Sequence, residues 1–94
     1  MSHLRIVRFT LDDGSRADAQ AMADDLVGSI KQQPGCRGAW FGAGVDGECG
    51  LIVLWEDEAH ADAAAVHISP KLMGHIGGRT TRPPDIHLLP VIAS

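Results

Sequence analysis

Histidines are the side chains of this sequence best suited to acid–base chemistry near neutral pH. His60, His67 and His75 lie seven and eight residues apart, so on an uninterrupted helix they would share one side. An imidazole, with an unperturbed pKa of about 6.5, can take a proton from an acidic carbon or phenol. We interpret His60 as a surface residue and predict His67 and His75 as catalytic candidates. The alternative for both is a hydrogen-bonded, partly buried histidine without activity.

A metal site is not expected from these residues. The histidines show no HxH or HxxxH spacing, and neither cysteine lies near them. Cys36 and Cys49 form no CxxC pair, so we interpret both as small, half-buried apolar residues on strands in a reducing compartment. The strand pairing described below puts them far apart, and we expect no disulfide between them.

Two tryptophans could bind a flat, apolar ligand by stacking. If the turn between their strands centres on Asp46-Gly47, Trp40 lies opposite Val53 and Trp55 lies opposite Gly38. Both indoles would then lie on one face of the sheet, and we predict both as substrate-binding residues. Core packing is the alternative for Trp55.

Apolar residues beside His75 and one arginine complete the predicted site. Leu72 and Met73 would form an adaptable apolar wall, and Arg8 could stabilise negative charge on a substrate. The alternative for Arg8 is a solvated strand residue. We predict a functional cleft between the second helix and the sheet, lined by His75, His67, Trp40 and Met73.

Alternating apolar residues and turn signals predict four strands, at residues 4–11, 36–43, 49–55 and 85–92. The Asp-Gly turn makes the second and third strands antiparallel neighbours, and Pro90 confines the last strand to an edge or a bulge.

Helical spacing of apolar residues predicts two helical regions. The first is capped by Ser15 and ended by Pro34-Gly35. The second follows an acidic start at 56–58 and is rich in alanine. Ser69-Pro70 is expected to interrupt it, with Ser69 capping a short further segment at 71–76.

Length and charge exclude several classes of protein. The chain has 94 residues, enough for one domain (1–94) and too few for two, and its net charge of −4 leaves no basic stripe for nucleic acid. No stretch approaches the about 18 to 20 apolar residues of a membrane span, so we expect a cytoplasmic protein without a membrane partner.

The third predicted strand gives a reason to expect a partner chain. Leu51-Ile52-Val53-Leu54-Trp55 is apolar at every position, although a sheet covered by helices on one side needs apolar residues only there. We therefore predict a homodimer in which a second subunit covers the other face.

The order of the elements resembles that of the antibiotic biosynthesis monooxygenase superfamily. The resemblance also rests on Pro34-Gly35-Cys36-Arg37-Gly38 before the second strand, and on 51–55 running into Glu56-Asp57-Glu58 and an alanine-rich helix. It implies an α+β, ferredoxin-like βαββαβ fold with a four-stranded antiparallel sheet and helices on one face. Two such sheets would face one another in a dimeric α+β barrel.

The same resemblance implies a cofactor-independent monooxygenase-like protein acting on a small hydrophobic or aromatic substrate. Well-studied oxygenases of the superfamily use Asn and Trp, often with Tyr or Arg, but this sequence contains neither Asn nor Tyr. Other members degrade haem, and His75 lies where their haem-binding histidine would. A haem-binding or haem-degrading protein using His75, and a non-catalytic dimeric ligand-binding protein of the same fold, are therefore the alternatives.

Overall fold

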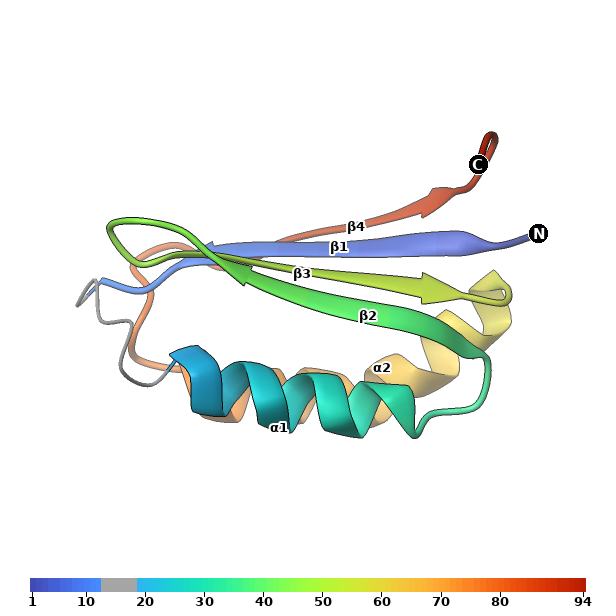
Figure 1. Ribbon diagram of the computed structural model, residues 1–94. Helices are drawn as coiled ribbons and strands as arrows, with labels where there is room; N and C mark the ends of the chain where they lie inside the picture. The colour runs from blue at the N-terminus through green and yellow to red at the C-terminus, as the bar shows by residue number, and fades with distance from the viewer. Residues whose placement is uncertain (13–18) are drawn as a thin grey trace.

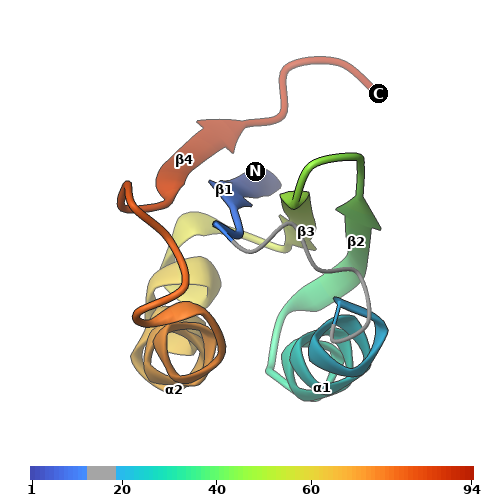
Figure 2. The ribbon, with the colours of Figure 1, turned by 90° about the vertical axis from the view of Figure 1, so that its left-hand side faces the viewer.

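Six elements follow one another in the computed structural model, which describes residues 1–12 and 19–94. Four strands form one antiparallel sheet in the order β2-β3-β1-β4, and both helices lie on one face of it (Figure 1, Figure 2). This is the ferredoxin-like βαββαβ arrangement that the sequence predicts. The predicted cap at Ser15 lies outside the described residues. The elements are β1 (His3–Thr10), α1 (Ala19–Lys31), β2 (Cys36–Ala43), β3 (Glu48–Trp55), α2 (Glu58–Ile76) and β4 (Asp85–Pro90).

The two faces of the sheet differ in what covers them. On β3, Leu51, Val53 and Trp55 point towards the helices and are each no more than 3% exposed. Ile52 points the other way and is 42% exposed. The helices contribute their own apolar stripes to the core, namely Met22, Leu26 and Ile30 of α1 and Ala61, Ala64, Leu72 and Ile76 of α2.

The hairpin between β2 and β3 is one residue out of the predicted register. Gly44 and Glu48 close it, with the Gly44 N–H donating to the Glu48 carbonyl at 2.7 Å, so the loop holds three residues, 45–47, and not two. Asp46 and Gly47 take the left-handed backbone conformation, at φ 56° and 80°.

A slip of one residue moves every side chain to the other face. Trp40 lies opposite Ile52, and Trp55 lies opposite Cys36. The prediction that both tryptophans share a face is therefore wrong. Cys36 and Cys49 lie at opposite ends of the hairpin and are both free thiols, which confirms that they form no disulfide.

Helix α2 is continuous, which contradicts the predicted interruption at Ser69-Pro70. Its N-cap is Asp57, whose carboxylate accepts the backbone N–H of His60 at 2.8 Å. Pro70 lies inside the helix and has no N–H to donate, a defect that costs about 3 kcal/mol in an isolated helix. Burial of Leu72 and Ile76 beyond the proline offsets that cost and keeps the last turns helical.

Strand β4 lies at the edge of the sheet, as Pro90 predicts, and pairs with β1. Within the described residues, no helix is long and apolar enough to cross a membrane.

Candidate functional site

The candidate site is a narrow space between α2 and the covered face of the sheet, which we call the α2 cleft. Ala61 and Ala64 of α2 face β3 across it, and because their side chains are small, a space of about 50 Å³ remains. The walls are almost entirely apolar and include Val53 and Trp55 of β3 and Leu72 of α2, with Arg5 of β1 as the charged exception.

Trp55, one of the residues that line this apolar wall, carries a buried polar atom. Its side chain is 3% exposed, and its indole Nε1 is buried without a hydrogen-bond partner among the described residues. A buried donor left unpaired costs about 1 to 3 kcal/mol. Since an indole can only donate, this atom is suited to an oxygen acceptor on a ligand that enters the cleft.

Arg5 supplies a positive charge at the edge of the α2 cleft. Its guanidinium lies 3.6 Å from a carboxylate oxygen of Asp62, so the ion pair joins β1 to α2. The Arg5 side chain is 22% exposed, whereas that of Asp62 is 65% exposed. Arg5 was not among the predicted site residues, although its alternation with Val7 and Phe9 on β1 places it on the helix-covered face.

His75 lies between the two helices. Its Nε2 is 2.6 Å from a carboxylate oxygen of Asp25 on α1, and Lys71 Nζ reaches the same carboxylate at 3.0 Å. The hydrogen bonds from His75 and then Lys71 lower the pKa of Asp25 below its ordinary value. His75 therefore joins α2 to α1 and is not among the residues that line the α2 cleft.

The other predicted residues on α2 separate according to helical phase. Leu72 is 4% exposed and lines the cleft, as Ala61 and Ala64 do. Met73 is 49% exposed and His67 is also on the surface, because neither position is in phase with the buried stripe.

Trp40 and Arg8 are brought together on the opposite side of the sheet, which we call the open face. They border a shallow hollow of about 490 Å³ whose floor includes the paired glycines 42 and 50. Trp40 is 59% exposed, and Arg8 lies 3.4 Å from Glu48. Of the seven predicted site residues, only Trp55 and Leu72 line the α2 cleft, so the sheet separates them from Trp40 and Arg8.

Solved structures similar to this chain share its whole fold. Rv0793 from Mycobacterium tuberculosis has a TM-score of 0.83 and 20% identity, over 100% of this chain and 98% of that one. SnoaB, a cofactor-independent oxygenase from Streptomyces nogalater, has a TM-score of 0.80 and 16% identity, over 99% and 95%. An antibiotic biosynthesis monooxygenase has a TM-score of 0.76 and 16% identity, over 99% and 100%.

The chain has the fold of the antibiotic biosynthesis monooxygenases. This agrees with the resemblance found in the sequence. No protein-family model matches the sequence, and no curated protein matches it. At these identities the likeness to the monooxygenases concerns the fold, and the chemistry has to be argued from the side chains.

The arrangement of possible ligand side chains limits how a metal ion or a haem could bind to this chain. Within residues 1–12 and 19–94, no group of three or more His, Cys, Asp or Glu side chains could hold a metal ion. A haem ligand at His75 would first have to leave Asp25, whose carboxylate already occupies its Nε2.

Proposed function

We propose that this protein is a cofactor-independent monooxygenase-like enzyme that holds a small hydrophobic or aromatic substrate in the α2 cleft. The observation that carries the proposal is the buried indole N–H of Trp55, which has no partner among the described residues and belongs to a side chain of an apolar wall. The fold shared with SnoaB, which is described as a cofactor-independent oxygenase, supports it.

The chemistry follows from what the cleft offers to a substrate. A phenol or an activated methylene loses a proton, and its electron-rich anion reduces oxygen directly, so that one oxygen atom enters the product as a carbonyl and the other leaves as water. Trp55 donates a hydrogen bond to the substrate oxygen that takes up the negative charge, and Arg5 stabilises that charge from the cleft edge. Together these two groups lower the pKa of the substrate, so that solvent can accept the proton. His67 and His75, which the sequence predicts as catalytic bases, stay predictions.

Binding requires the cleft to widen, because about 50 Å³ is far below the roughly 300 Å³ or more of typical ligand pockets. The Arg5–Asp62 pair is the contact to be broken, and a partly exposed ion pair contributes only about 0 to 1 kcal/mol. Opening this pair also frees Arg5 to face the substrate.

A non-catalytic ligand-binding protein of the same fold is the second candidate. One observation favours it: no histidine or carboxylate side chain is among the described residues that line the cleft. Such a protein would bind the same apolar ligands through Trp55 and leave them unchanged.

The proposed assembly is a homodimer formed through the open face. Trp40, Ile52 and Leu89 are 59%, 42% and 47% exposed there, and Leu54 is half-buried. A second copy would cover these side chains, and an obligate interface of this kind buries about 2,000 Å² or more. The apolar open side of β3 supports this proposal, since none of the described residues of the chain covers it.

Oxygen uptake with anthrone, a tricyclic compound with an acidic methylene, tests the catalytic proposal. We expect Trp55→Phe to lower kcat/KM by about tenfold or more, because one hydrogen bond to developing charge is lost. The matched control is Trp40→Phe, which removes an indole from the other face and should leave turnover unchanged. Anthrone binding without oxygen uptake would select the non-catalytic candidate. If anthrone does not bind to the cleft at all, both candidates fail.

A further inference from the structure

A second pocket opens where the chain leaves the sheet after α2. The last β1–β4 pair is Arg8 with Asp85, and continuing the register would place Pro84 and Pro83 beside Phe9 and Thr10. Neither proline has a backbone N–H to donate to β1, so the pairing stops at Asp85 and residues 79–84 are not part of the strand.

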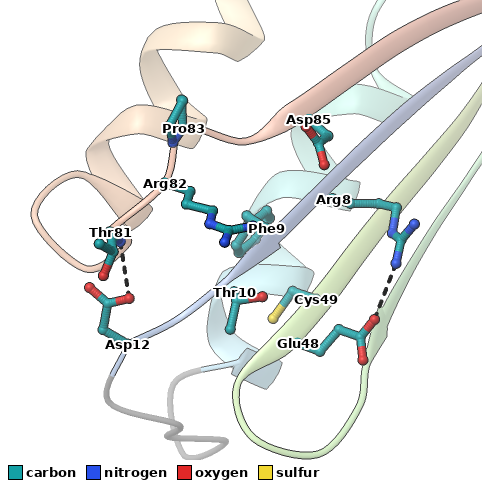
Figure 3. Close-up of a pocket in the computed structure, with 10 residues that line it drawn as sticks. All are labelled: Arg8, Phe9, Thr10, Asp12, Glu48, Cys49, Thr81, Arg82, Pro83 and Asp85. Carbon is teal, nitrogen blue, oxygen red and sulfur yellow. Dashed lines mark hydrogen bonds and ion pairs between the residues drawn. The ribbon is translucent and has the colours of Figure 1, made fainter.

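Two hydrogen bonds return this linker to the end of β1. The Asp12 N–H donates to the Arg79 carbonyl at 2.7 Å, and the Thr81 N–H donates to the Asp12 carboxylate at 3.0 Å. Between these bonds and the Arg8–Asp85 pair lies a pocket of about 470 Å³, the linker pocket (Figure 3). Its volume is within the range of about 300 to 1,000 Å³ of small-molecule sites.

Two guanidinium groups border the linker pocket; Arg8 also borders the hollow of the open face, which the proposed dimer would cover, so Arg82 is the one offered to an anion. Arg82 extends from the linker into the pocket, and no carboxylate of the described residues lies within ion-pair distance of it (Figure 3). Among the described residues, Arg8 is held only by a 3.4 Å contact with Glu48, and both side chains are more than half exposed. A planar guanidinium can bind a carboxylate through two hydrogen bonds.

The same pocket also carries three carboxylates, so a simple anion matches it poorly. Asp12 accepts the Thr81 N–H, Glu48 faces Arg8, and Asp85 makes no ion pair with the described residues. A ligand that carries both an ammonium and a carboxylate would satisfy Asp85 and Arg82 together. Phe9 and Pro83 add apolar surface for a side chain.

We propose that the linker pocket binds a free α-amino acid with an apolar side chain, its carboxylate on Arg82 and its ammonium on Asp85. The linker pocket shares no lining residue with the α2 cleft. Two of the residues that line it, Phe9 and Cys49, are buried on the covered face of the sheet. The proposal stands whether or not the cleft proves catalytic.

Titration of the whole, isotope-labelled chain with L-leucine tests the pocket by NMR. Saturable shifts are expected at the backbone amides of Phe9, Thr81 and Asp85, with a Kd of about 1 mM or tighter. Isoamylamine lacks the carboxylate and isocaproate lacks the ammonium, so each should bind about tenfold or more weakly than leucine. If isocaproate binds as tightly as leucine does, the pocket is a plain anion site and the proposal is overturned. No shift with leucine would overturn it entirely.

Two charge-removing variants locate the contacts. Arg82→Gln and Asp85→Asn should each weaken leucine binding by about tenfold. Arg82→Gln should no longer distinguish leucine from isoamylamine, and Asp85→Asn should no longer distinguish leucine from isocaproate. The matched control is Arg37→Gln, an exposed arginine of β2 that lies 4.0 Å from Glu56 and away from the pocket. Unchanged binding in both pocket variants would contradict the proposal.

Discussion

The covered and open faces of the sheet use similar apolar side chains in different ways. On the covered face, Leu51 and Val53 are 2% exposed, because the helices of the same chain bury them. On the open face, Ile52 keeps 42% of its surface exposed. The stability supplied by the first face belongs to the single chain, whereas in the proposed homodimer that of the second would depend on a partner and therefore on concentration.

The largest effect is expected from a charge on the open face. In the proposed homodimer, Ile52→Lys would bury an unpaired ammonium, so the dimer should dissociate and the chain should lose most of its stability. Analytical ultracentrifugation and urea unfolding at two protein concentrations measure both effects.

A control for that experiment comes from α2. Val66 is also apolar and is 72% exposed, but it lies outside the open face, so Val66→Lys should change the free energy of unfolding by no more than about 0.5 kcal/mol. A wild-type chain that is monomeric at micromolar concentration would contradict the proposed dimer.

A cavity on the covered face should have a smaller effect that does not depend on concentration. Leu26 of α1 is fully buried against the sheet, so Leu26→Ala should lower the free energy of unfolding by about 2 to 5 kcal/mol. Urea unfolding at several concentrations should show this decrement unchanged. A decrement that grows on dilution would mean that α1 also takes part in the interface.

The smallest effect concerns the bond between the two helices and acid stability. Because its folded-state pKa is lowered, Asp25 contributes stability that is fully present above its unfolded pKa of about 4 and is lost as the pH falls through the folded value. Asp25→Asn should therefore reduce stability at pH 7 and flatten its decline below about pH 4. Thermal unfolding across pH measures this, with Asp24→Asn on the same helix as the control. Parallel acid limbs in the two variants would remove Asp25 from this role.

Local patterns in the sequence predicted the elements better than they predicted the site. Alternation on β1 and the apolar stripes of both helices fix the layer order, and Pro90 marks the edge strand. Backbone geometry decides whether the hairpin loop between Gly44 and Glu48 holds two or three residues. Because the predicted loop was one residue too short, the prediction put Trp40 on the wrong face of the sheet.

The other features that the sequence did not predict depend on contacts between residues distant in sequence. The pair His75 and Asp25 is separated by 50 positions, and no local spacing indicates it. The continuity of α2 through Pro70 depends on the burial of residues beyond the proline, which is a tertiary effect. Arg5, by contrast, could have been predicted from the sequence, since the alternation on β1 already assigns it to the covered face.

The separation of the two tryptophans gives the molecule two natural optical reporters. The chain has no tyrosine, so its near-ultraviolet fluorescence comes almost wholly from Trp40 and Trp55. In the separate chain, the exposed indole of Trp40 should emit at longer wavelength and be open to iodide quenching, whereas the buried indole of Trp55 should be shielded. Shielding of the first signal would follow coverage of the open face, and a change in the second would follow ligand entry into the cleft, both without any added label.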